Sequence, residues 1–361
     1  MNVINESEIL VTKSTKIFRR PFLVSLAICG IAAGLVFAIN GCSGNGYGSI
    51  EKRSKQSSNG EPQVLKIVAT TEMVADIVRH VVGAHGTVAG LMGSGTDPHL
   101  FKATRNEIKK LYDADVVFYS GLMLEGRMQE TLKQVNTAAR PVIAVTSGLE
   151  ANEPGFLRSP PDFEGHFDPH VWMDVNAWSR CTEVVVETMS KVDPAHAGDY
   201  EQNAKEYRAE LSELDQYVKQ VIHSIPESQR VLVTAHDAFG YFGSRYGIDV
   251  RSVQGVSTEA EAGIKDVNRL VDFLVERKLP AIFVESSVNE KNIRAVIEGA
   301  GSRGVTVKVG GELFSDAMGA EGTYEGTYVG MLDHNATMIS QALGGTAPEK
   351  GFRNRLNARQ N

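Results

Sequence analysis

The sequence predicts an α/β protein made of two (βα)4-type lobes with parallel sheets, joined by a single long helix. Short β-branched runs alternate with longer amphipathic segments from residue 64 to about 145, and the alternation starts again near Arg230. Such alternation is typical of parallel sheets covered by helices. Between the two blocks lies one continuous apolar stripe at helical spacing, which predicts the joining helix.

The first block, residues 64–192, is interpreted as the N-terminal lobe. Its strands are expected at 64–70, 87–92, 115–120 and 141–145, and its helices at 71–82, 103–112 and 126–138. The run at 115–120 reads DVVFYS and has the apolar character of a buried strand.

The linking helix is expected over residues 193–225. Apolar residues recur there in steps of four and three, and the positions between them are mostly charged or amide side chains, which is the pattern of one apolar face. Asp193 and Pro194 are typical of a helix start, and Pro226 ends the segment. About thirty residues at 1.5 Å per residue reach roughly 45 Å, enough to follow a whole domain.

The second block, residues 226–343, is interpreted as the C-terminal lobe. Its strands are expected at VLVTAH, DVRSVQG, PAIFVESS and VTVKVG, the last over 305–309, and its helices at 261–278, 291–300 and 324–343. Residues 344–361 are rich in glycine and polar side chains, and we expect a disordered, frayed tail.

The first 63 residues indicate export. Arg19 and Arg20 precede an uncharged stretch of twenty residues, 21–40, which predicts a secretory signal over residues 1–41. The stretch ends in Ile-Asn-Gly-Cys, which resembles a bacterial lipobox with Cys42 as the lipidated residue. An uncleaved membrane anchor is the alternative, because twenty helical residues can span a bilayer. Residues 43–63 are rich in glycine, serine and charge, so 42–63 is interpreted as a flexible tether.

The charge of the chain argues against a nucleic-acid partner. The formal net charge is −7, and residues 1–41 carry more basic than acidic side chains, so the remainder is more acidic still. An acidic body repels phosphate backbones. The chain is 42% hydrophobic and 22% charged with ordinary glycine and aromatic contents, which excludes disordered and collagen-like classes.

Three histidines occupy unusual positions. Asp-Pro-His occurs twice, ending at His99 and at His170, and Ala235-His236-Asp237 lies just beyond VLVT. Proline fixes the backbone before the histidine, and the ends of parallel strands are where α/β sheets place ligands. Asp316, beyond the last strand, is the fourth candidate.

Three imidazoles and one carboxylate from four separate segments are a ligand set for a first-row transition metal. On the residues alone, any one strand-end histidine is better explained as a loop residue bonded to the backbone, but the repeated Asp-Pro-His shifts the balance, so composition and spacing favour a metal site as a hypothesis. Asp168, Asp237 and Glu285 are candidates for orienting the imidazoles, with capping of nearby backbone as the alternative. His166 has no assigned role.

The chain resembles the substrate-binding proteins of zinc and manganese ABC transporters, the cluster A-I, TroA-like lipoprotein receptor family. The resemblance covers residues 64–343. It rests on TEMV at 71–74, GTDPHL at 95–100, GL at 121–122, LEG at 124–126, DPHVWMD at 168–174, TAHDAF at 234–239, FVESS at 283–287 and FSD at 314–316. Two departures are that Met123 stands where many relatives have histidine, and that no long His-rich loop is present.

The resemblance implies one divalent ion, Zn²⁺ or Mn²⁺, bound between the lobes by His99, His170, His236 and Asp316 as the transported ligand. It implies an extracytoplasmic, periplasmic lipoprotein that delivers the ion to an ABC permease driven by an ATPase, and no enzymatic activity. We expect a monomer, held at a membrane by its lipid. Zinc and manganese rank close together, with iron third.

Two rival functions are a secreted zinc-dependent hydrolase and an adhesin with a structural metal. No His-Glu-x-x-His motif occurs, and four protein ligands leave no open position for an activated water, which argues against the hydrolase. Glu285 is the residue that would serve as its base.

Overall fold

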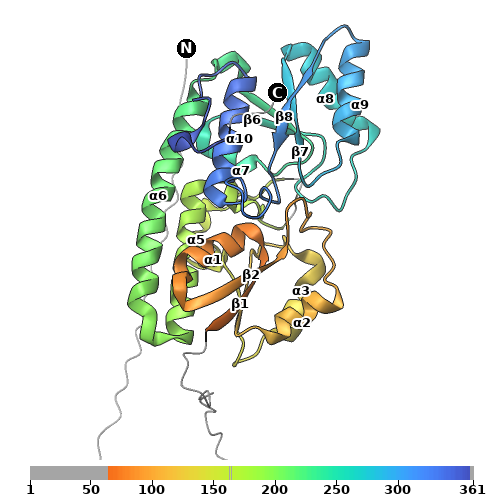
Figure 1. Cartoon of the computed structure of the whole chain (residues 1–361). Helices are drawn as coiled ribbons and strands as arrows, with labels where there is room; N and C mark the ends of the chain where they lie inside the picture. Colours follow the sequence, from red (N-terminus) through yellow and green to blue (C-terminus); the bar gives the residue numbers. More distant parts are fainter. Residues whose placement is uncertain (1–63, 162, 164, 358–361) are drawn as a thin grey trace, which may run out of the picture. The chain divides into compact units, whose positions relative to one another are not determined.

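A computed structural model describes residues 64–161, 163 and 165–357 of the 361-residue chain. These residues form the two α/β lobes and the long joining helix that the sequence predicts (Figure 1). The predicted signal, lipobox and tether at 1–63 lie outside the described residues. Within the part that is described, no helix combines the length and the hydropathy needed to cross a membrane.

The N-terminal lobe is built on one four-stranded parallel sheet with strand order β2-β1-β3-β4. Its elements are β1 (Leu65–Thr71), α1 (Glu72–Val82), β2 (Gly86–Met92), α2 (Arg105–Asp113), β3 (Val116–Tyr119), α3 (Gln129–Val135), β4 (Val142–Ala144), α4 (Ser147–Asn152) and α5 (Val175–Val192). The central strands β1 and β3 are largely buried, in keeping with their β-branched runs. Neither the short helix α4 nor the longer α5 was among the predicted helices.

Helix α1 illustrates how local sequence sets an element. Thr71 ends β1 and caps α1, because its hydroxyl accepts a hydrogen bond from the Val74 amide at 3.3 Å. Gly83 ends the helix with φ of 56°, a conformation that glycine adopts without strain. Most side chains of α1 are buried, because the helix packs on β1 and β2 on one side and on α5 and α6 on the other.

The C-terminal lobe pairs its strands in two parallel two-stranded sheets, β5–β6 and β7–β8, with β5 in contact with β7. Its elements are β5 (Val231–Thr234), α7 (Gly240–Tyr246), β6 (Asp249–Ser252), α8 (Ile264–Arg277), β7 (Ala281–Glu285), α9 (Lys291–Ser302), β8 (Lys308–Leu313) and α10 (Tyr328–Ala342). The short helix α7 was not predicted.

Strand β8 begins and ends later than the predicted 305–309. Gly310 and Gly311 interrupt the β-branched pattern, so the sequence suggested an end where the strand continues. Glycine is required there because a Cβ on Gly311 would lie 1.7 Å from the sulfur of Met338 in α10. The two glycines therefore let α10 pack directly on β8.

The linking helix is α6 (Ala197–His223), preceded by one 3₁₀ turn at Pro194–His196. Its predicted apolar stripe is buried, comprising Tyr200, Ala204, Tyr207, Leu211, Leu214, Val218 and Val221. The 27 residues of α6 span about 40 Å. In the N-terminal lobe the helix packs on α1 and α5, and in the C-terminal lobe on α7 and α10 (Figure 1).

Hydrogen bonds from α6 reach both lobes. The Tyr207 hydroxyl donates to Asp76 of α1 at 2.7 Å, and the Tyr217 hydroxyl lies 2.7 Å from that of Thr337 in α10. One continuous helix is thus bonded to both lobes, which makes it a rigid spine.

The expectation of a frayed tail is wrong for residues 344–357, which pack against α6 and α10. The Phe352 ring is buried 5.3 Å from the Tyr217 ring, and its amide donates to the buried Asp333 carboxylate at 2.8 Å. Arg353 pairs with Glu210 of α6 at 2.9 Å. The single aromatic residue among polar neighbours gave no periodic pattern to detect. Residues 358–361 lie outside the described part.

We expect Phe352→Ala to lower the free energy of unfolding by about 3 kcal/mol, because it removes a buried ring that joins the tail to the spine helix. Urea unfolding followed by circular dichroism measures the change. Lys350→Ala, at an exposed position two residues earlier, is the matched control and should leave the midpoint unchanged. Equal midpoints for both variants would show that the tail contributes nothing to stability.

Candidate metal centre

The four predicted ligands come from four loops that follow or precede helices and strands of both lobes. His99 lies in the loop between β2 and α2, and His170 comes just before the 3₁₀ turn that leads to α5. His236 lies two residues beyond β5, and Asp316 lies three residues beyond β8. The strands that precede His99, His236 and Asp316 are β2, β5 and β8, and each is paired in parallel. The carboxyl ends of parallel strands are where such folds place ligands.

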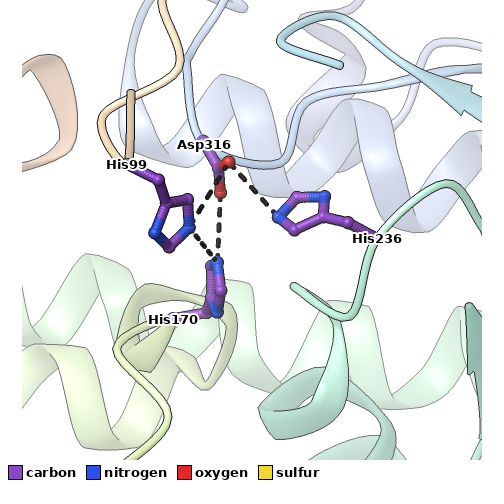
Figure 2. A group of neighbouring side chains, drawn as sticks. All are labelled: His99, His170, His236 and Asp316. Atoms are coloured by element: carbon purple, nitrogen blue, oxygen red, sulfur yellow. Dashed lines mark hydrogen bonds and ion pairs between the residues drawn. The ribbon is translucent and has the colours of Figure 1, made fainter. Parts of the chain in front are cut away.

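The four side chains converge between the lobes (Figure 2). One donor atom from each of His99, His170, His236 and Asp316 lies within 4.8 Å of the others, and all four residues are buried. Nε2 of His99 and Nε2 of His170 are 3.3 Å apart. The two Asp316 oxygens lie 3.2 Å from Nε2 of His170 and 3.2 Å from Nε2 of His236.

These separations fit a metal ion. Four ligands at about 2.0–2.1 Å from a tetrahedral ion lie about 3.3 Å from one another. Nε2 of His236 and both Asp316 oxygens are buried and make no acceptable hydrogen bond within the described residues. Buried polar atoms without partners are rare, and here they point into the space that an ion would occupy. The group can hold one metal ion.

Two of the three imidazoles are oriented by carboxylates. Asp168 accepts hydrogen bonds from Nδ1 of His170 at 2.8 Å and from its amide at 3.0 Å. Glu285, at the end of β7, accepts from Nδ1 of His236 at 2.5 Å, and its other oxygen accepts the His236 amide at 2.9 Å. With the proton on Nδ1, each Nε2 presents a lone pair to the site.

His99 is held through its backbone. One Asp97 oxygen accepts the His99 amide at 2.9 Å, and the other accepts the Thr258 hydroxyl of the C-terminal lobe at 2.6 Å. Burial raises the pKa of Asp97. This aspartate therefore ties the loop that bears His99 to the opposite lobe.

The charges of the metal-free site shift its pKa values strongly. Burial lowers the pKa of His170, but the hydrogen-bonded carboxylate of Asp168 and the charge of the facing Asp316 outweigh it and raise that pKa to about 9. Burial is likewise outweighed at His236, where Glu285 and Asp316 hold the pKa well above the ordinary value. Burial dominates at His99 and lowers its pKa to about 3. Despite burial, the two facing histidines hold the pKa of Asp316 well below its usual range.

The other residues singled out in the sequence do not belong to the cluster of four ligands. Among the described residues the Asp237 carboxylate bonds none of the three ligand imidazoles. His166 is exposed and packs against Phe163, at the edge of a cavity of about 310 Å³ lined by Tyr119 and Glu150. Met123 is 40% exposed and takes no part in the cluster.

Two contributors were assigned no role from the sequence. Trp172 donates from Nε1 to the Ser315 carbonyl at 2.9 Å, which fixes the neighbour of Asp316 to the N-terminal lobe. Arg158 pairs with Asp168 at 2.9 Å from a loop without any periodic pattern. Such contacts join residues more than a hundred positions apart or lie in irregular loops, so spacing cannot reveal them.

The orientation of His236 by Glu285 leads to a prediction. Glu285→Gln replaces the carboxylate that holds Nδ1, and we expect metal binding to weaken by about 10- to 100-fold, the usual effect of losing such a partner. Isothermal titration with Zn²⁺ and Mn²⁺ measures the dissociation constants. Glu312→Gln, on the exposed face of the neighbouring β8, is the control. An unchanged constant for Glu285→Gln would limit Glu285 to bonding the backbone amides.

The two-lobed fold and the buried cluster of three imidazoles and one carboxylate define a metal-binding protein with its site between lobes. Residues 67–342 match the family described as zinc-uptake complex component A, periplasmic, and the chain belongs to this family.

Named relatives bind different metals. The chain is 45% identical over 315 residues to the manganese-binding lipoprotein MntA of Bacillus subtilis (strain 168), covering 87% of this chain and 99% of that one. It is 44% identical over 287 residues to the zinc-binding protein TroA of Treponema pallidum (strain Nichols), covering 80% and 90%. The solved structure of the periplasmic zinc-binding protein TroA superposes with a TM-score of 0.74 at 43% identity, covering 78% of this chain and 99% of that one.

A third relative carries a transporter name. The metal ABC transporter substrate-binding lipoprotein FimA of Streptococcus parasanguinis is 29% identical over 295 residues, covering 80% of this chain and 93% of that one. This chain therefore covers nearly the whole length of each relative. The names of the relatives describe binding proteins.

Proposed function

We propose that this protein captures a divalent transition metal ion outside the cytoplasm and delivers it to an ABC permease driven by an ATPase. The observation that carries the proposal is the convergence of His99 and His170 from one lobe with His236 and Asp316 from the other, within 4.8 Å. A site shared between two lobes suits capture and release, because small relative movements change all ligand distances at once. The transporter name of one relative supports the delivery step.

The ion is Zn²⁺ or Mn²⁺. Three imidazoles and one carboxylate satisfy a four-coordinate zinc site, whereas manganese prefers more oxygen, which a bidentate Asp316 supplies in part. Both Asp316 oxygens face the site and are free of hydrogen bonds within the described residues, so either mode is open to them. The relatives named for manganese and for zinc are 45% and 44% identical, so similarity favours neither.

The protein acts as an extracytoplasmic, membrane-anchored monomer in this proposal. Residues 1–41 serve as the signal, Cys42 carries the lipid, and residues 42–63 tether the lobes. Support comes from the charge pattern of the N-terminal segment and from the relatives named as lipoproteins. Metabolic labelling with a lipid precursor, lost in Cys42→Ala, tests the anchor.

The decisive experiment combines metal content with growth. The full chain, purified from membranes, is analysed for bound metal by mass spectrometry, and a deletion strain is grown on limiting zinc or limiting manganese. We expect one equivalent of zinc or manganese and a growth defect that added metal and the wild-type gene both reverse. Normal growth of the deletion strain, together with peptide or ester hydrolysis by the purified protein, would favour a hydrolase instead.

A further inference from the structure

Arg158 contacts a carboxylate that holds one of the candidate metal ligands. It lies in the loop after α4, and its Nη1 donates to Oδ2 of Asp168 at 2.9 Å. The other oxygen of the same carboxylate holds the imidazole of His170. The Arg158 side chain is 31% exposed, whereas Asp168 is fully buried. Arg158 thus connects the surface to a metal ligand through one shared carboxylate.

The charges around the centre make this contact important. Asp168, Glu285 and Asp316 all contact ligand imidazoles and are all buried. Among the ion pairs of the described residues, Arg158 is the only arginine or lysine that pairs with any of these three carboxylates. A buried carboxylate needs a compensating charge, so Asp168 depends on Arg158.

Arg158 is held in place by both lobes. Its amide donates to the Tyr241 hydroxyl at 3.1 Å, and the same hydroxyl donates to the Asp168 carbonyl at 2.8 Å. The guanidinium lies 5.6 Å from the Tyr241 ring centre and fills the space above Gly240. A Cβ on Gly240 would lie 1.3 Å from Nη1 of Arg158. Glycine at the start of α7 in the C-terminal lobe therefore makes room for an arginine of the N-terminal lobe.

We infer that Arg158 is a positioning residue for metal binding, which fixes Asp168 so that His170 presents Nε2 to the ion. The ion pair holds Oδ2, and this leaves Oδ1 aligned with Nδ1 of His170. Because Gly240 and Tyr241 belong to the other lobe, contact between the two lobes near α7 supports this alignment. This inference rests on the proposed function and identifies a residue that sets its affinity.

The test compares four variants for Zn²⁺ and Mn²⁺ dissociation constants and for the visible absorption spectrum of the Co²⁺-loaded protein, which reports ligand geometry. Arg158→Met should weaken metal binding about tenfold. This is the lower end of the effect of losing a carboxylate that holds a ligand, because Arg158 contacts that carboxylate, Asp168, and not the ligand His170 itself. Arg158→Lys should recover most of the affinity, because an ammonium keeps the charge and one donor. Gly240→Ala keeps the arginine but displaces it, and should weaken binding in the same direction.

Arg180→Met is the matched control. Arg180 lies in the same lobe, is 37% exposed, pairs with Glu153 at 2.8 Å and stacks on Phe156, but contacts no carboxylate of the site. Its loss should leave both the dissociation constants and the cobalt spectrum unchanged. If Arg180→Met weakens binding as much as Arg158→Met, the effect is general destabilisation and the inference is overturned.

The outcomes separate this inference from the proposed function. Wild-type protein that binds no metal contradicts the proposed function. Wild-type protein that binds metal while Arg158→Met and Gly240→Ala bind equally well, with unaltered cobalt spectra, contradicts only the role of Arg158. Should Arg158→Met fail to fold, the comparison of Gly240→Ala, which displaces the guanidinium, with Arg158→Lys, which keeps a charged donor beside Asp168, tests the same inference.

Discussion

Asp316→Ala is expected to weaken Zn²⁺ binding by at least about 100-fold, more than the loss of an outer partner. Asp316 is the only anion among the four candidate ligands, and its oxygens face all three imidazoles. The loss should be larger for Mn²⁺ than for Zn²⁺, because three imidazoles alone suit zinc while manganese depends on oxygen ligands. Titration with each metal measures both constants, and the ratio between them is the diagnostic quantity.

His236→Ala is the companion variant and should weaken the binding of either metal by at least about tenfold. For Mn²⁺ the loss of affinity should be smaller in His236→Ala than in Asp316→Ala. The exposed His223 at the end of α6 supplies the control, His223→Ala, which should bind as the wild type does. A wild-type constant for His236→Ala would exclude this histidine from contact with the ion. Equal zinc-to-manganese ratios in all variants would show that Asp316 does not determine selectivity.

Metal affinity is expected to rise steeply with pH around neutrality. In the metal-free protein the pKa of His170 is about 9 and that of His236 is well above 6.5, so both imidazoles carry protons at pH 7. The metal needs neutral imidazoles, and binding therefore releases about two protons. The logarithm of the association constant should then increase by up to about two per pH unit near pH 7, and the part of the rise that comes from His170 should end above about pH 9.

Metal affinity rises with pH because protons and the metal ion compete for the same imidazole nitrogens. Acid therefore favours release of the ion. Histidines of ordinary pKa would place the threshold for metal binding near pH 6.5, and the buried carboxylates move it upward. Calorimetry in buffers of different ionisation enthalpy counts the released protons. Glu285→Gln removes one of the charges that raise the His236 pKa and should reduce the count toward one, while Glu312→Gln should not. A count near zero for the wild type would contradict the protonated state of the site.

The fold class could be predicted from the sequence because the helical spacing and the β-branched runs indicated the same α/β architecture. The three- and four-residue spacing along α6 predicted its buried face from Tyr200 to Val221, and the β-branched runs predicted the strands. Predictions failed where a single contact outweighed composition. Gly310 and Gly311 extend β8 because Met338 packs over them, and Phe352 orders a polar tail because one buried carboxylate accepts its amide. Neither cause leaves a periodic pattern.

The candidate ligands were predictable because stiff Asp-Pro-His turns and strand ends mark His99, His170 and His236 individually. That the four side chains converge depends on how the lobes meet, which only the structure displays. Glu285 orients His236 as proposed from the sequence, whereas Asp237, its equal in the sequence, bonds none of the ligand imidazoles within the described residues. Arg158 shows most clearly what the sequence could not predict. Its proposed role depends on contacts with the C-terminal lobe and on Gly240, which makes room for its guanidinium.

The unbroken spine α6 has a thermodynamic consequence for loading. Since the same helix is bonded to Asp76 in one lobe and to Thr337 in the other, ion uptake can bring little new apolar surface out of water. Binding should therefore show a heat-capacity change near zero, unlike receptors that shut around a hinge. Small-angle scattering should give equal radii of gyration with and without the ion. In the proposed function, the permease would then distinguish filled from empty protein by side-chain placement at the rim rather than by overall dimensions.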